Sequence, residues 1–131
     1  MPSISSILTT LVVAQAAYVQ ALGSQQCHGS TEFGTHGDVD AVYVAAGAKQ
    51  CQGIGYNIES GQDSTHWTVE QGETPYHFVV SWVIGCEGDS QPVSSDCAEW
   101  LYNDYNNCNN GGAGGWIDDG CVRYEFKPTT D

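Results

Sequence analysis

Basic residues are scarce in this 131-residue chain, which has three Lys and Arg against 16 Asp and Glu and a formal charge of −13. A surface of this sign repels nucleic-acid phosphates and anionic lipid headgroups. We therefore expect no nucleic-acid partner and no insertion into membranes. Charged residues make up only 15% of the chain, but a hydrophobic fraction of 40% is too high for a disordered protein.

Motifs of several enzyme and metalloprotein classes are also missing. The chain has no G-x-S-x-G, no HExxH and no phosphate-binding glycine loop. No two cysteines are spaced as Cys-x-x-Cys, which argues against a zinc site. Asp38-x-Asp40 and Asp118-Asp119 offer oxygen ligands for Ca²⁺, but a helix cap and a turn explain them better. We expect no metal, no cofactor and no catalytic residue.

The N-terminal stretch reads as a secretory leader. Residues 1–23 carry no charged side chain and form an apolar run that ends in small residues. Such a run is typical of a signal peptide, here with cleavage between Ala16 and Gly23. As a membrane anchor it would be short and polar for a span of about 30 Å. We predict a signal peptide at 1–23, one folded domain at 24–131 and an extracellular, secreted protein.

Six cysteines follow this leader: Cys27, Cys51, Cys86, Cys97, Cys108 and Cys121. An even number in a short secreted chain predicts three disulfides. Cys97 cannot pair with Cys108 if one continuous helix carries both, because eleven residues of helix span about 16 Å and a disulfide needs Cα atoms within about 7 Å. Among the connectivities left open, we expect neighbours in the sequence to pair: Cys27 with Cys51, Cys86 with Cys97, and Cys108 with Cys121.

Hydrophobic periodicity predicts two helices. The first begins after an N-cap at Asp38 and buries a stripe at helical spacing: Val39, Val42, Tyr43 and Ala46. The second begins after an N-cap at Asp96 and buries another: Cys97, Trp100, Leu101, Tyr105 and Cys108. It should end at the turn-forming Asn109-Asn110-Gly111-Gly112.

The remaining pattern predicts strands. Residues 76–86 alternate with apolar side chains on both faces, so we expect a central strand covered on both sides. Short strands are expected at 54–58 and 66–70, and Asp119-Gly120 predicts a hairpin between strands at 115–117 and 121–127. The predicted fold class is a small single α+β domain, with an antiparallel sheet packed by two helices and held by three disulfides.

Residues 102–119 are rich in groups that bind sugars. Aromatic rings can stack on the C–H surface of a sugar, while amides and carboxylates bind its hydroxyls. Tyr102 lies off the buried stripe of its helix and Trp116 lies beside a glycine-rich loop, so both should face solvent. In the competing interpretation Trp116 fills the core. The candidate glycan-binding residues are Trp116, Tyr102, Asn106, Asn109, Asn110 and Asp118.

Several motifs centred on cysteines resemble a known family. In chain order they are Cys27-His28-Gly29-Ser30, a helix ending near Cys51, an aromatic strand ending at Cys86, a helix opening at Cys97, Cys108-Asn109-Asn110-Gly111-Gly112, and Gly115-Trp116. Together they resemble the small secreted glycan-binding proteins of mushrooms, a lectin family first described from an inky cap. The resemblance implies an α+β domain that binds glycans or glycoproteins without catalysis. Because single sugar contacts are weak, we also expect more than one site per assembly, for example in a homodimer.

Two other classes of secreted fungal protein stay open. One is an effector or toxin that acts on a host protein. The other is a small acidic ribonuclease, whose acid, base and phosphate-binding groups would come from four residues: His66, Glu70, His77 and Arg123. Tyr76-His77 before a strand is compatible with the fungal guanyl-specific ribonucleases, but Arg123 is the lone Arg of the chain and would bind the phosphate by itself. We therefore favour neutral glycans as the ligands.

Overall fold

A computed structural model describes residues 23–34 and 36–130, so the predicted signal peptide lies outside the described residues except for Gly23. The sheet contains five antiparallel strands in the order β1-β6-β7-β4-β3. Their bounds are Gln26–Cys27 (β1), Gly115–Asp119 (β6), Val122–Lys127 (β7), Thr74–Trp82 (β4) and Thr65–Gln71 (β3). A second, two-stranded sheet pairs β2 (Ile58–Glu59) with β5 (Ser90–Gln91).

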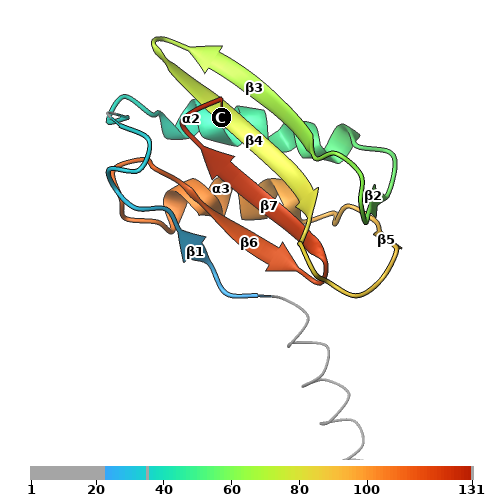
Figure 1. Cartoon of the computed structure of the whole chain (residues 1–131). Coiled ribbons are helices and arrows are strands. Elements are labelled where there is room, and N and C mark those ends of the chain that lie inside the picture. Colours follow the sequence, from blue (N-terminus) through green and yellow to red (C-terminus); the bar gives the residue numbers. More distant parts are fainter. Residues whose placement is uncertain (1–22, 35, 131) are drawn as a thin grey trace, which may run out of the picture.

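Two helices cover one face of the large sheet (Figure 1): α2 (Ala41–Ala48), which continues into a 3₁₀ turn at Lys49–Gly53, and α3 (Cys97–Asn106). The predicted α+β domain with an antiparallel sheet, two helices and three disulfides is confirmed. Among the described residues, no helix has the length and apolar character needed to cross a bilayer.

The core lies between the helices and the covered face of the sheet. Alternate residues of β4 and β7 point toward the helices and are almost fully buried: Tyr76, Phe78, Val80, Val122, Tyr124 and Phe126. In both strands the side chains between these residues point to the opposite face. β4 is central, between β3 and β7, as predicted, but helices cover only one of its faces. The strand also ends at Trp82, and Ile84, expected inside it, is 100% exposed.

The first helix differs from its prediction in start and in buried face. Its N-cap is Asp40, whose carboxylate accepts a hydrogen bond from the Val42 amide at 2.8 Å, and not Asp38. Val42, expected in the core, is 71% exposed. The helix instead contacts the sheet through Gly47, where an added Cβ would lie 2.4 Å from the Phe78 ring. The face of α2 that packs on the sheet is therefore set by the close approach that Gly47 allows, and not by the most apolar stripe of the helix.

The second helix is close to its prediction, since Asp96 occupies the N-cap position and Cys97 and Leu101 are buried. It ends at Asn106, so Cys108 lies beyond it. The strand expected at 54–58 is reduced to the two residues of β2, and the short strands β1 and β5 were not predicted. Both new strands add only two residues each, too few to leave an alternating pattern.

The predicted disulfide pairing is wrong in every bond. Cys27 pairs with Cys108, Cys51 with Cys97, and Cys86 with Cys121. The exclusion of a Cys97–Cys108 bond is right. Each bond joins segments that the sheet and helices bring together, at sequence separations of 35 to 81 residues, and not neighbours along the chain. The packing of helices, strands and turns in the folded chain therefore brings the paired cysteines together, which spacing along the sequence cannot show.

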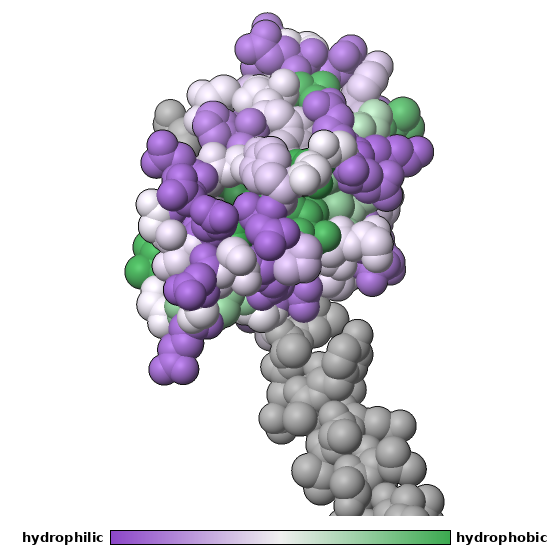
Figure 2. All heavy atoms as spheres, turned by 90° about the vertical axis from the view of Figure 1, so that its right-hand side faces the viewer, coloured by the Kyte–Doolittle hydropathy of each residue, from purple (hydrophilic) through white to green (hydrophobic). Residues whose placement is uncertain are grey.

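Figure 2 shows the end of the molecule that carries β2 and β5. Hydrophilic side chains cover most of this end, and hydrophobic ones form small, separate patches. A large apolar docking surface is therefore missing from the view in Figure 2. The feature that stands out is on the sheet, on the face that the helices leave open.

Candidate functional site

Strand register assembles one row of side chains across the open face of the sheet. The row runs Gln26, Trp116, Glu125, Val79 and His66 over β1, β6, β7, β4 and β3. Since side chains alternate along a strand, these residues point away from the helices while their neighbours fill the core. Trp116 therefore lies on the outer face and does not belong to the core cluster. The competing interpretation, in which it fills the core, is excluded.

Trp116 is half-buried, and a fixed ion pair flanks its ring. The Arg123 guanidinium carbon lies over the indole at 5.2 Å from the ring centroid. The same guanidinium donates to both carboxylate oxygens of Asp118, from Nε at 2.8 Å and Nη2 at 3.1 Å. A two-point contact of this kind fixes the orientation of both groups. The pair therefore presents a rigid polar edge next to the indole.

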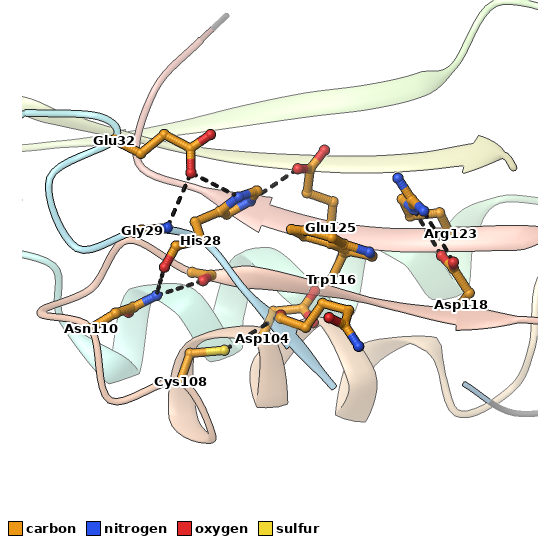
Figure 3. A network of polar contacts seen from close by, with 12 residues as sticks. His28, Gly29, Glu32, Asp104, Cys108, Asn110, Trp116, Asp118, Arg123 and Glu125 are labelled. Atoms are coloured by element: carbon orange, nitrogen blue, oxygen red, sulfur yellow. Dashed lines mark hydrogen bonds and ion pairs between the residues drawn. The ribbon is translucent and has the colours of Figure 1, made fainter. Parts of the chain in front are cut away.

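His28 flanks the ring from the other side (Figure 3). Its imidazole lies 5.1 Å from the Trp116 ring and packs edge-on against Phe33 at 4.9 Å. Its Nε2 lies 3.0 Å from a carboxylate oxygen of Glu125, and its Nδ1 lies 3.5 Å from Glu32. We call Trp116 with its four polar neighbours, His28, Asp118, Arg123 and Glu125, the Trp116 surface.

Backbone contacts hold the His28 segment in place. The His28 amide donates to the Gly114 carbonyl at 3.0 Å, which extends the β1 pairing. The Asn110 side chain donates to the His28 carbonyl at 2.9 Å and to Gly114 at 2.8 Å. The Cys27–Cys108 disulfide fixes the residue before His28. Hydrogen bonds and the disulfide together therefore fix the segment that carries His28.

The charges of this surface compensate one another. Burial acts to raise the pKa of Glu125, but the hydrogen bond from His28 and the charges of Lys127, His28 and Arg123 outweigh it, so this pKa lies below its usual value. Glu125 is therefore ionised near neutral pH. Arg123 is matched by Asp118, and its own pKa is raised chiefly by that hydrogen bond. The surface has many donors and acceptors and little uncompensated charge.

A buried carboxyl group supports Trp116 from below. Asp104 of α3 is 0% exposed, and its Oδ1 accepts a hydrogen bond from Gln25 Nε2 at 2.9 Å. The same amide group donates to the Trp116 carbonyl at 3.1 Å. Burial, more than any other cause, raises the pKa of Asp104 well above its usual value, and the nearby Glu125 and Asp118 add to the rise.

The structure separates the six candidate residues. Trp116 and Asp118 share the Trp116 surface. Asn110 is used internally, as described above. Tyr102 is half-buried against the core, so the prediction that it faces solvent on that helix is wrong in part. Asn106 and Asn109 are exposed, but they line a separate cleft at the end of α3.

Three members of the Trp116 surface, Arg123, Glu125 and His28, were missing from the glycan-binding candidates, and one signal could have found the first two. The hairpin expected between strands at 115–117 and 121–127 already brings Trp116 beside the outward side chains of the last strand, Arg123 and Glu125. A two-residue loop at 119–120 would pair Trp116 with Arg123, whereas the loop is Gly120-Cys121 and Trp116 lies opposite Glu125. His28 left no such signal, since it lies in a loop after a two-residue strand.

The residues weighed for a ribonuclease lie on this same open face. The rings of His66 and His77 are 5.3 Å apart, and Lys127 is directly across from His77. Burial, followed by the charges of Lys127 and His66, lowers the pKa of His77. Arg123, however, is four positions from Lys127 along β7, about 13 Å away. The two imidazoles converge, but the guanidinium does not join them.

No arrangement for a metal ion is evident in residues 23–34 and 36–130, where no three His, Cys, Asp or Glu side chains are grouped to hold one. Comparisons with family models, with curated proteins and with solved structures found no match. The resemblance to the mushroom lectins therefore stays a prediction.

Proposed function

We propose that this protein is a secreted, non-catalytic, lectin-like protein that binds uncharged saccharide rings at the Trp116 surface. One observation carries the proposal: a half-exposed indole on a rigid strand lies between two fixed polar pairs, Arg123–Asp118 and His28–Glu125. An indole offers a large apolar surface at low conformational cost. The flanking donors and acceptors can bind hydroxyl groups.

Charge favours an uncharged ligand. The chain has a formal charge of −13, so polyanions meet a repulsive field. At the site the Arg123 guanidinium is paired with Asp118 at 2.8 Å, which leaves little free positive charge for a phosphate or sulfate. Neutral saccharides avoid both penalties.

The extracellular location is part of the proposal. All six cysteines are bonded in three disulfides, and such bonds persist in oxidising compartments. This agrees with the apolar stretch at 1–23, which lies outside the described residues apart from Gly23. Edman sequencing or mass spectrometry of protein recovered from culture medium would locate the cleavage site.

The test is a glycan array probed with oxidised protein and its Trp116→Ala variant. We expect the affinity to fall at least about tenfold in Trp116→Ala, because losing about 1.4 kcal/mol of binding free energy lowers an affinity tenfold. Trp116→Phe should retain part of it, because the smaller ring can still stack. Val42→Ala is the matched control, a truncation of a 71% exposed side chain on the helical side. Failure of the wild type to bind any glycan would overturn the proposal.

RNA cleavage is the second candidate function, favoured by the approach of His66 and His77 beside Lys127. Two imidazoles at this distance could act as acid and base on one phosphodiester. An assay on single-stranded RNA separates the two functions. Cleavage by the wild type that is lost in His77→Ala, together with a blank array, would favour the enzyme. Inert RNA and array binding would favour the lectin.

A further inference from the structure

The helical side of the molecule contains a polar cleft that the Trp116 surface does not include. The cleft has a volume of about 520 Å³ and lies where α3 ends, against the segment that leads into α2. Small-ligand sites fall in the range of about 300–1,000 Å³. We call it the Asn cleft and define it by six of its lining residues: Gly37, Tyr105, Asn106, Asn109, Gly111 and Gly112.

The walls of the Asn cleft match the hydrogen-bonding needs of a sugar. Asn106 and Asn109 are exposed, and Asn106 makes one long contact, to the Asn107 side chain at 3.5 Å. Both amides can therefore turn toward a ligand. α3 ends at Asn106, and the Asn107 amide donates to the Asn103 carbonyl at 2.8 Å, so the carbonyls that follow Asn103 in the last turn meet no further helical amide. The half-buried Tyr105 adds an aromatic surface.

The lining is uncharged, which sets the class of ligand. None of its side chains is Asp, Glu, Lys or Arg. In a protein with a charge of −13, such a cleft favours an uncharged group rich in hydroxyls over an anion.

The back of the cleft is fixed before any ligand arrives. His36 is only 5% exposed, and its Nδ1 contacts the Gly111 carbonyl at 2.6 Å. Its Nε2 is buried and has no hydrogen-bond partner among the described residues. Behind Gly112 the chain is so close that an added Cβ would lie 3.0 Å from the His36 carbonyl. The glycine turn therefore has no room to collapse inward.

Asn110 joins the cleft to the first site. It belongs to the turn that forms the cleft wall, and its side chain holds the carbonyls of His28 and Gly114 at 2.9 and 2.8 Å. α3 packs on the covered face of the sheet, whereas Trp116 points from the open face. The two sites therefore lie on different sides of one rigid body.

We propose that the Asn cleft is a second saccharide site, so that one chain binds two sugar units. The proposal deepens the proposed function and rests on it for the class of ligand. Two sites on different sides allow a single chain to cross-link a multivalent glycan without dimerising, which supplies avidity.

The experiment is an NMR titration of ¹⁵N-labelled, oxidised full-length mature protein. The probes are the methyl glycosides of glucose, galactose, mannose and N-acetylglucosamine. One group of signals reports the Asn cleft: the side-chain amides of Asn106 and Asn109 and the backbone amides of Gly111 and Gly112. The Trp116 indole N–H reports the first site. We expect both groups to shift with at least one probe.

Gly37→Leu should block the cleft. An added Cβ at Gly37 meets nothing within 4 Å, so the larger side chain can enter the cleft without a clash at its base. Gly55→Leu is the matched control, because Gly55 also has open space at this position and does not line the cleft. We expect Gly37→Leu to weaken binding at the cleft signals about tenfold and to leave the Trp116 signal unchanged. Asn109→Ala provides a second variant if Gly37→Leu fails to fold.

The outcomes separate the two proposals. Shifts at Trp116 with none at the cleft signals would overturn the Asn cleft and leave the Trp116 site standing. Shifts at the cleft that Gly37→Leu removes, with none at Trp116, would support the cleft and overturn the first site. Shifts at the cleft that persist in both Gly37→Leu and Asn109→Ala would also overturn the cleft, as would a blank titration with all four glycosides.

Discussion

Replacing Asp104 by Asn should stabilise the protein at neutral pH. The carboxyl group is 0% exposed, and its Oδ2 is buried without a hydrogen-bond partner, as is the Oε1 of the adjacent Gln25. Hydrogen bonds from Gln25 and the Phe126 backbone favour the ionised carboxylate, but burial and repulsion from Glu125 and Asp118 outweigh them. Asn keeps the shape of the side chain, carries no charge and adds an N–H₂ group that can donate to the side-chain Oε1 of Gln25.

The magnitude follows from the buried, unpartnered atoms. Leaving such an atom without a hydrogen bond costs about 1–3 kcal/mol. We therefore expect Asp104→Asn to raise the free energy of unfolding at neutral pH by about 1–3 kcal/mol. Asp104→Ala should instead lower the free energy of unfolding, because the side-chain amide of Gln25 would lose one of its acceptors and a buried side chain would be truncated.

The pH dependence has a definite sign. The pKa of Asp104 is raised in the folded state, so the folded protein binds more protons than the unfolded chain between the ordinary pKa and the raised one. Across that interval this group lowers the stability by up to about 1.4 kcal/mol for each unit of rising pH. Below the ordinary pKa of about 4 both states are protonated, and the penalty disappears.

The assay is denaturant unfolding with the disulfides intact, followed by tryptophan fluorescence between about pH 4 and pH 8. The quantity to compare is the difference between Asp104→Asn and wild type, because it cancels the other titrating groups. We expect this difference to grow from acid to neutral pH. A variant that is less stable than wild type at neutral pH, or a difference independent of pH, would refute the reasoning.

Three further predictions concern packing, the Glu125 pair and the disulfides. Gly47→Ala should lower the free energy of unfolding by about 1–3 kcal/mol, because the added Cβ would lie 2.4 Å from the Phe78 ring. Gly55→Ala, the control, should change it by no more than about 0.5 kcal/mol. Thermal unfolding of both variants measures the difference. Glu125→Gln should lower stability at neutral pH by about 1 kcal/mol, and the deficit should vanish as the pH falls through the lowered pKa of Glu125; a deficit that persists in acid would speak against the pair. Replacing Cys86 and Cys121 together by Ala should cost about 2–4 kcal/mol for the 35-residue separation, and peptide mapping of unreduced protein should recover that bond; a Cys86–Cys97 peptide would contradict the structure.

The longer strands and the second helix could be predicted because their patterns are local. Alternation of side chains predicted the strands at 76–86 and 121–127, since successive residues of a strand point to opposite faces. Asp119-Gly120 marked the final hairpin, where Gly120 has a φ of +59°. Asp96 marked the start of α3. Each of these signals lies within a few residues of the feature that it predicts.

Features that depend on distant contacts could not be predicted. Cys27 and Cys108 meet because β1 adds to β6, a pairing of only two residues. The face of α2 depends on how closely Gly47 approaches Phe78. At the site, the prediction that Trp116 lies outside the core is confirmed, and the candidate Asp118 lies beside it on the same face. The sequence did not separate Asn106 and Asn109 from Trp116 and Asp118. Only the fold shows that the end of α3 lies on the other side of the sheet.

Saturation-transfer NMR with the saccharide that binds best on the array tests the central claim most directly. We expect the sugar C–H protons to receive magnetisation from the Trp116 ring, and the effect to be lost in Trp116→Ala while the variant keeps its three disulfides and its fold. A bound saccharide whose protons contact neither this indole nor its flanking side chains would contradict the account.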